Sequence, residues 1–174
     1  YIDERFDCPQ RDITESNMKD RVFTERSDFD TSTAKTMHIN KSSDLYDVNK
    51  NDTVILEDDI YISSDQMIKI ELFNGIFDGD GYTISGLKNS LFKQIGNKAT
   101  IKDLTLEDSN IENESMENSL LCSVNKGTIK NITIKSTDIK LQGTGDLGLI
   151  SSTNKGNIVD CEVYNTTIKA LEYK

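Results

Sequence analysis

The sequence predicts an all-β fold, a right-handed parallel β-helix (a solenoid) preceded by a less regular N-terminal segment or cap. Three observations predict it. A repeat of 28 to 29 residues is present, apolar and polar residues alternate inside each copy, and only 35% of the 174 residues are hydrophobic. That content is low for an ordinary globular core. Stacked repeats bury a continuous core with few apolar positions in each copy, and this architecture explains the low hydrophobic content.

The repeat is marked by Asn-Lys, then a small residue, then Thr or Asn, then Ile, starting at Asn97, Asn125 and Asn154. Clear copies cover residues 91–111, 120–139 and 149–168. We expect the three asparagines to stack as an amide ladder at one corner of the coil. Six columns of mostly apolar residues superpose under the same offsets: Ile101, Ile129 and Ile158; Leu104, Ile132 and Cys161; Leu106, Ile134 and Val163; Ile111, Ile139 and Ile168; Leu91, Leu120 and Leu149; Phe92, Leu121 and Ile150.

The spacing inside each copy predicts strands. Leu104 and Leu106 alternate with polar residues, as do Ile132 and Ile134, which is the two-residue period of a strand with one buried face. One copy is too small to bury its own face, so neighbouring copies must stack, with strands about 4.8 Å apart. A leucine-rich repeat would be shorter and would need a helix or a fixed Asn consensus. A β-sandwich would not predict columns in register.

The predicted coils cover residues 37–174. Before the clear copies, residues 53–62 read as a strand and residues 73–87 as an earlier, less regular coil in which Phe77, Ile84 and Leu87 point inward. Gly79 and Gly81 permit a tight corner there. Residues 37–45 are expected to supply a first strand.

Residues 1–36 differ in kind from the rest of the chain. They hold all four arginines, few apolar residues and no alternation, with at best a weak helical stripe. We interpret this segment as a linker, as a partly helical cap over the open end of the coil, or as disordered. A cap is chemically reasonable because an uncovered terminal coil exposes unpaired strand edges.

The stretch Gly75–Leu87, then Leu91-Phe92, then Thr100–Ile111, resembles the β-helical repeats of bacterial surface proteins. It is similar to the GLUG-motif proteins and to the non-catalytic N-terminal domain of the IgA-specific zinc metalloendopeptidases, over residues 45 to 168. The resemblance implies this fold and a bacterial, extracellular or cell-surface setting. The glycine-rich loop of the GLUG motif is reduced here to Gly145–Ile150. The zinc-protease signature His-Glu-x-x-His is absent because His38 is the only histidine, so no peptidase role is implied.

Composition narrows the function classes further. A net charge of −10 argues against nucleic acid as a partner, because phosphate binding needs clustered Lys and Arg. No apolar run is long enough for membrane insertion. A polysaccharide lyase needs a basic residue near bound calcium, yet no Arg follows Arg26 and no His follows His38. Glycoside hydrolysis needs converging carboxylates, but a surplus of acid is equally typical of a solvated surface.

No catalytic residue, cofactor or cofactor-binding residue is predicted, and no metal site is expected. Asp78 and Asp80, in Asp-Gly-Asp-Gly, are the candidates for calcium, but they lack the further donors of an EF-hand loop and are more typical of a plain turn. Cys161 occupies an aliphatic column and is predicted to be a buried thiol. A disulfide between Cys122 and Cys161 is the alternative.

The sequence therefore predicts a non-catalytic, extracellular or cell-surface module that is not an enzyme. It would bind a glycan or protein ligand of a host or cell wall, for adhesion, or space other domains. A carbohydrate-active β-helix enzyme and a trimeric fibre segment are the alternatives. Because the chain begins with Tyr1 rather than Met, neighbouring domains of a longer protein are expected.

Overall fold

The computed structural model describes residues 33–113, 117–142 and 146–171. Within these ranges the fold is all-β with one short 3-10 helix, and every strand pairing is parallel. The predicted class, all-β with parallel sheets, is confirmed. Residues 1–32, most of the predicted N-terminal segment, lie outside the described ranges.

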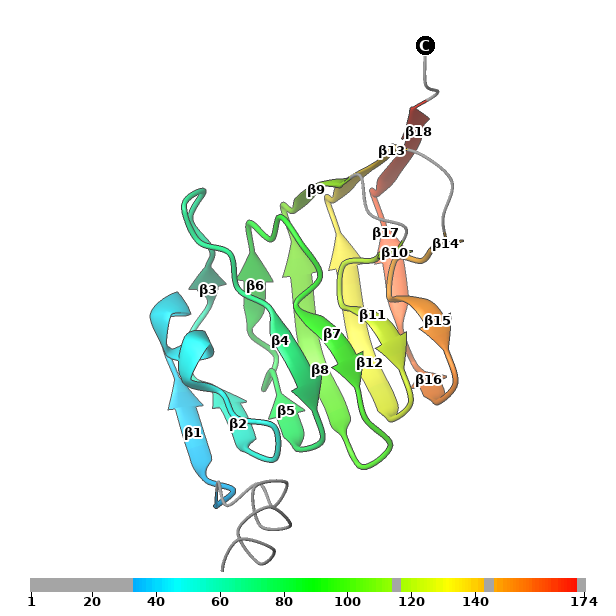
Figure 1. The fold of residues 1–174 in the computed structure, drawn as a ribbon. Coiled ribbons are helices and arrows are strands. Elements are labelled where there is room, and N and C mark those ends of the chain that lie inside the picture. Colours follow the sequence, from blue (N-terminus) through cyan, green and yellow to red (C-terminus); the bar gives the residue numbers. More distant parts are fainter. Residues whose placement is uncertain (1–32, 114–116, 143–145, 172–174) are drawn as a thin grey trace, which may run out of the picture. The chain divides into compact units, whose positions relative to one another are not determined.

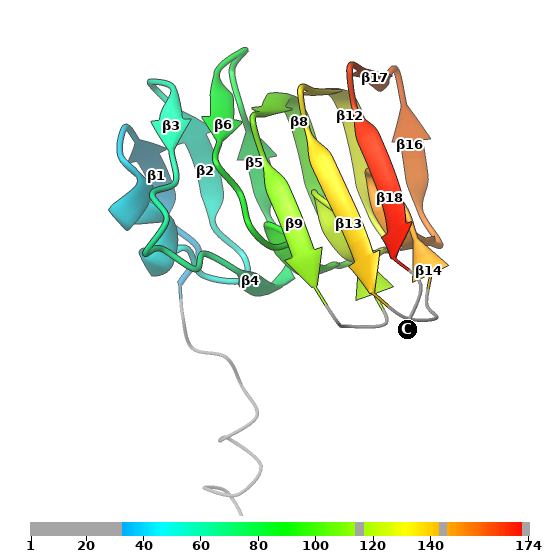
Figure 2. The same cartoon turned by 90° about the horizontal axis from the view of Figure 1, so that it is seen from above.

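The strands form three main sheets and one small pair around a shared core (Figures 1 and 2). Sheet A has the order β1 (Thr36–Ile39), β2 (Thr53–Leu56), β5 (Ile76–Asp78), β8 (Thr100–Glu107), β12 (Thr128–Lys135), β16 (Asn157–Val159), joined by β3 (Ile60–Tyr61), β6 (Thr83–Ser85) and β17 (Glu162–Tyr164). Sheet B has the order β4 (Ile70–Phe73), β7 (Phe92–Ile95), β11 (Cys122–Asn125), β15 (Ser151–Asn154). Sheet C contains β9 (Asn110–Asn113), β13 (Asp138–Gln142) and β18 (Thr167–Leu171), and β10 (Glu117–Asn118) pairs with β14 (Asp146–Leu147).

The register of sheets A and C confirms the central columns predicted from the repeat. Ile129 in β12 pairs with Ile101 in β8 and with Ile158 in β16. In the same way, Ile134 pairs with Leu106 and Val163, and Ile139 pairs with Ile111 and Ile168. The offset of 28 and 29 residues is therefore the spacing from β8 to β12 and on to β16 and β17 in sheet A, and from β9 to β13 and on to β18 in sheet C.

The core consists of these columns and of the earlier, less regular repeats. Ile129, Ile134 and Ile139 are fully buried, and so are Phe77 and Ile84, two residues predicted to point inward. The rings of three phenylalanines pack together with centroids 5.4 to 6.3 Å apart: Phe73, Phe77 and Phe92. Leu87, the third residue predicted to point inward, is 1% exposed.

The last described repeat is less covered than the one before it. Ile158, Val163 and Ile168 are 36%, 39% and 47% exposed, although their partners in β12 and β13 are fully buried. No described strand pairs with the far edge of β16, β17 or β18. Cys161 is half-buried for the same reason, so the prediction of a buried thiol at this position is wrong.

The predicted three-member amide ladder is wrong for Asn97. Asn125 pairs with Asn154, and its Nδ2 donates to Asn154 Oδ1 at 2.8 Å, but on the other side Asn125 pairs with Ile95. Four residues, 96–99, separate β7 from β8, whereas two, 126–127, separate β11 from β12. Asn97 therefore lies in a longer corner and is exposed. The same shift pairs Phe92 with Cys122 rather than with Leu121.

This difference predicts unequal effects of removing the two amides. Asn125 is fully buried, donates to Asn154, and accepts a hydrogen bond from the Gly127 N–H at 3.0 Å. We expect Asn125→Ala to lower the free energy of unfolding by about 1 to 3 kcal/mol, because Gly127 N–H and Asn154 Oδ1 lose their partner. Asn97→Ala should change it by less than about 0.5 kcal/mol. Urea unfolding measures both, and equal losses would contradict the register.

Two further columns consist of residues with a left-handed backbone, in or directly after the strands of sheet A. They were not recognised in the sequence. Their residues have a positive φ of 47° to 53°, which Asp and Asn tolerate better than most residues: Asp103, Asn131 and Asp160 in one column, Asp108, Ser136 and Asn165 in the other. Just after the second column, the hydroxyls of Ser109, Thr137 and Thr166 each donate to the carbonyl two residues earlier. The corners thus repeat with the same spacing as the core.

The first repeat departs from the predicted strand over residues 37–45. Strand β1 ends at Ile39, and the 3-10 helix η2 (Ser42–Asp47) follows. Only Leu45 of η2 is buried, so this segment covers the core through a single side chain where later repeats place a strand of sheet B.

At the corner predicted for Gly79 and Gly81, Gly81 has a φ of 84°, and a side chain on Gly79 would collide with the backbone of Asp103.

Candidate functional site

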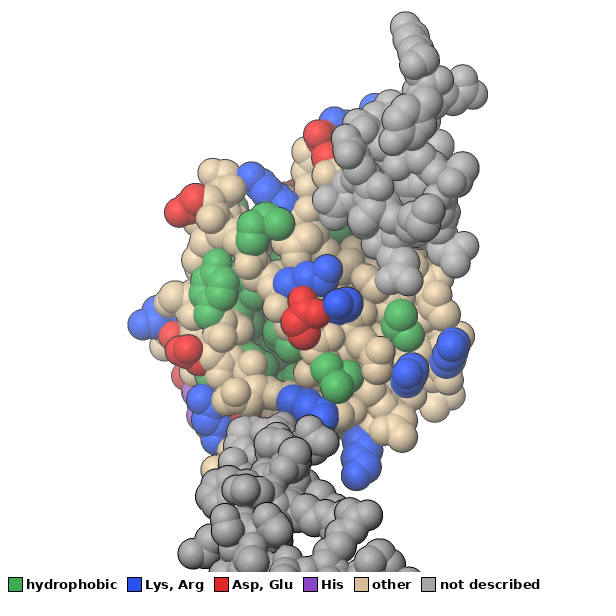
Figure 3. Space-filling view, in the orientation of Figure 1, with side chains coloured by type: hydrophobic (Ala, Val, Ile, Leu, Met, Phe, Trp, Pro, Cys, Tyr) green, Lys and Arg blue, Asp and Glu red, His purple; other side chains and the backbone are tan. Residues whose placement is uncertain are grey.

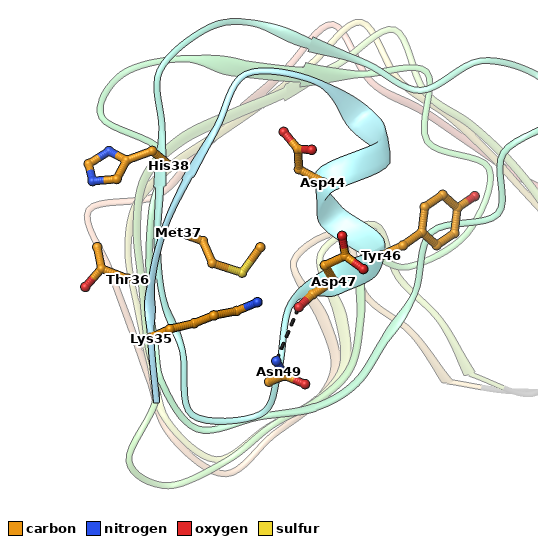
Figure 4. Close-up of a pocket in the computed structure, with 8 residues that line it drawn as sticks. All are labelled: Lys35, Thr36, Met37, His38, Asp44, Tyr46, Asp47 and Asn49. Carbon is orange, nitrogen blue, oxygen red and sulfur yellow. Dashed lines mark hydrogen bonds between the residues drawn. The ribbon is translucent and has the colours of Figure 1, made fainter. Parts of the chain in front are cut away.

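A hollow of about 650 Å³ lies at the end of the first repeat, between β1 and η2. Figure 4 shows the eight residues that line it: Lys35, Thr36, Met37, His38, Asp44, Tyr46, Asp47 and Asn49. Lys35 and Met37 point from the β1 side toward η2, Asp44 and Asp47 come from η2, and His38 points to the opposite side, away from η2. Among the described residues, the hollow is therefore the first end of the core, with a polar rim.

A buried carboxylate connects two backbone segments that border the hollow. Asp52, just before β2, is fully buried. Its Oδ1 accepts a hydrogen bond from the Lys35 N–H at 3.0 Å, and its Oδ2 accepts one from the Asn49 N–H at 2.8 Å. One side chain thus joins the chain entering β1 to the chain leaving η2, on opposite sides of the hollow.

The polar groups of the rim do not converge on one point. His38 Nδ1 lies 2.7 Å from Glu57 Oε1 on the outer face of sheet A, where both side chains are about half exposed. Asp44 Oδ1 lies 3.8 Å from Lys41 Nζ, and the Asn49 side-chain amide donates a hydrogen bond to the Asp47 carbonyl. The histidine therefore lies apart from the carboxylates of the hollow. This arrangement offers hydrogen bonds to a ligand but does not bring an acid and a base together.

The structure brings the calcium candidates into a turn between β5 and β6. Asp78 Oδ1 accepts a hydrogen bond from the Asp80 N–H at 3.0 Å, and the Asp78 carboxylate forms an ion pair with Lys102 of the next repeat. Lys102 also pairs with Asp103. Across the residues that the structure describes, no group of three or more His, Cys, Asp or Glu side chains gathers where a metal ion could bind.

The contacts within this cluster shift the pKa values of Lys102 and Asp103. Hydrogen bonds to Asp78, and then to Asp103, raise the pKa of Lys102. The Asn131 amide, and after it Lys102, hold the pKa of Asp103 below its usual range. Asn131 Nδ2 donates to Asp103 Oδ1 at 2.7 Å, so these contacts join three successive repeats. The side chains are solvent-accessible, so the cluster serves mainly to order the surface.

Ion pairs between successive repeats recur on other faces. Lys135 Nζ lies 2.7 Å from Glu107 Oε2, and Lys93 Nζ lies 3.1 Å from Glu71 Oε2. Lys140 forms an ion pair with Glu112. The hydrogen bond to Glu107 raises the pKa of Lys135. Sequence reasoning missed these pairs, although the 28-residue offset between Glu107 and Lys135 is a signal that could have found them.

The two described cysteines are free thiols, Cys122 buried and Cys161 half-buried, so the alternative of a disulfide between them is wrong. Burial raises the pKa of the Cys122 thiol to about 12, so almost no thiolate forms near neutral pH. The third cysteine of the sequence, Cys8, is replaced by Ser for this test. We then expect a thiol reagent to modify Cys161 of the folded protein first and Cys122 only after unfolding. Mass spectrometry of native and denatured samples measures this, and rapid native labelling of Cys122 would contradict the burial.

The comparisons agree with the resemblance seen in the sequence. Residues 58–136 match the family model described as the N-terminal region of the M26 IgA1-specific metallo-endopeptidases. This confirms the similarity to that N-terminal region, which is not the catalytic part of the family. No curated protein and no solved structure matches the chain significantly. Among the described residues, none of the helical structure is long and apolar enough to span a bilayer.

Proposed function

We propose that this chain is a non-catalytic, right-handed parallel β-helical module of a bacterial secreted or cell-surface protein, and that it spaces or presents neighbouring domains. Residues 37–174 form the coils in this proposal, and residues 1–36 are a cap or linker. The observation that carries it is the stacking of repeats in register, which continues to a last repeat whose inward columns are still partly exposed.

The order of the strands supports a single coil path. From β7 onward the chain passes through sheet B, then sheet A, then sheet C, and the next repeats follow the same order through β11, β12 and β13 and through β15, β16 and β18. Each strand pairs in parallel with its equivalent one repeat away. In sheets A and C the core columns and the corner columns of these repeats share the offset of 28 to 29 residues, so a further repeat can add without a change of geometry.

Two observations support the non-catalytic part of the proposal. The matched family model describes the N-terminal region of a peptidase family. In addition, Asp78, Glu107 and Glu112 are each paired with a lysine of the next repeat, which fits a role in stacking.

The stacking part is tested by adding one repeat to the chain. A second copy of residues 143–171 is placed directly after Leu171, in phase with the existing repeat. We expect the melting temperature to rise by about 5 °C or more, because the added strands cover Ile158, Val163 and Ile168. A scrambled copy of the same composition is the control. A rise that is equal with the scrambled copy, or no rise with the true copy, would contradict the proposal.

The non-catalytic part has its own assay. We expect no release of unsaturated or reducing sugars from acidic polysaccharides, with or without calcium, because the coils contain no Arg and no His after His38. Turnover that disappears when a single Asp is replaced would overturn this part and favour a carbohydrate-active enzyme.

A further inference from the structure

Strand β4 is an open edge of sheet B. It pairs with β7 on one side, and none of the other described strands pairs with its second side. The Ile70 N–H donates to Leu91 on the β7 side at 2.8 Å. Because alternate residues of a strand direct their N–H and C=O to opposite edges, Lys69 and Glu71 present theirs to the open side.

The chain begins to pair with this open edge but does not continue. The Asn74 N–H, just after β4, donates to the Lys50 carbonyl at 2.6 Å. Further along the edge, the preceding segment is the 3-10 helix η2, which cannot supply a ladder of strand hydrogen bonds. The first repeat therefore leaves one strand position of sheet B unfilled.

A groove of about 300 Å³ occupies that position, at the small end of the range for ligand pockets. Figure 3 shows hydrophobic side chains around a hollow on this face. Its apolar lining comes from η2, from the segment after it, from the residues just before β4 and from β4 itself: Leu45, Tyr46, Val48, Met67, Ile68, Ile70 and Leu72. Tyr46 and Met67 are 55% and 63% exposed, so an apolar side chain can reach the groove from solvent.

The charged residues of the groove determine which extended peptide segments it can favour. Its charged lining residues are Lys50, Lys69 and Glu71. Glu71 lies 3.1 Å from Lys93, so its charge is compensated, and the two lysines leave the groove positive in a chain whose net charge is −10. Acidic groups are therefore favoured beside the open edge.

We propose that this groove binds an extended segment of another polypeptide as an added parallel or antiparallel strand on β4. The bound segment alternates aliphatic residues, which enter the groove, with acidic residues, which meet Lys50 and Lys69. Main-chain hydrogen bonds to Lys69 and Glu71 provide the affinity, and the side-chain alternation provides the selectivity. This goes beyond spacing, because it makes the first repeat a docking point for a partner protein.

The test uses the full chain and a fluorescent, end-blocked heptapeptide in which Ile or Val alternates with Asp. Anisotropy should show saturable binding to the unmodified chain. Lys69→Glu is expected to weaken it about tenfold, and the same variant should bind a peptide with Lys in place of Asp better than the unmodified chain does. Lys98→Glu, an exposed lysine in another corner, should leave binding unchanged.

A second comparison tests the main-chain hydrogen bonds. N-methylation of the central peptide amides preserves every side chain and removes the donors, so we expect binding to be lost. Equal binding of the methylated peptide, equal effects of Lys69→Glu and Lys98→Glu, or no binding of the Asp peptide would overturn the proposal. Concentration-dependent self-association that Lys69→Glu abolishes would overturn it as well, in favour of a second copy as the occupant.

Discussion

Ile129→Asp is expected to lower the free energy of unfolding by about 3 kcal/mol or more. Ile129 is fully buried between Ile101 and Ile158 in the stacked column, so the new carboxylate would be buried among aliphatic side chains. Burying an unpaired polar or charged group is among the few changes that destabilise a protein this strongly. Urea unfolding followed by circular dichroism measures the loss.

Lys130→Asp is the matched control, because the neighbouring side chain lies on the exposed face of the same strand. It introduces the same residue one position along and should change the free energy of unfolding by about 0.5 kcal/mol or less. Similar losses for the two variants would mean that β12 does not have the inward and outward faces described here.

Asp52→Ala is the second substitution with a large expected effect. It removes the acceptors of the Lys35 and Asn49 backbone N–H groups at a fully buried position, and each unsatisfied buried donor costs about 1 to 3 kcal/mol. We therefore expect a loss of about 2 to 5 kcal/mol in the free energy of unfolding, measured by urea unfolding.

Asp59→Ala provides the comparison for Asp52. Asp59 also accepts a hydrogen bond from a backbone N–H, that of Thr83 at 2.8 Å, but it is exposed and water can replace it. Its removal should cost less than about 1 kcal/mol. If the two substitutions were equally mild, Asp52 would not be the buried anchor of the first repeat.

The fold class and the central columns could be predicted from the sequence because both depend on a period. Alternation within a copy defines the buried face, and the offset of 28 to 29 residues defines which strands pair, as Ile101, Ile129 and Ile158 demonstrate. The corner at Asn97 could not be predicted in this way. Matching Asn-Lys letters concealed two additional residues before β8, and the corner sets the register of sheet B.

The site was less predictable for a different reason. The hollow and the groove of the first repeat exist because η2 replaces a strand, and residues 42–47 carry no periodic signal for that change. Asp52 was not recognised, because a buried carboxylate that bonds two backbone amides has no local pattern. Cys161 lies between β16 and β17, and its exposure depends on what packs against the last described repeat, which the column of Leu104 and Ile132 does not reveal.

The most direct test of the proposed stacking compares one substitution in two chains. Val163 is 39% exposed in the present chain and would become buried beneath an added copy of residues 143–171. We expect Val163→Asp to cost about 1 kcal/mol or less in the present chain and about 3 kcal/mol or more in the extended one. An equal cost in both chains would contradict the claim that this module grows by stacking coils in register.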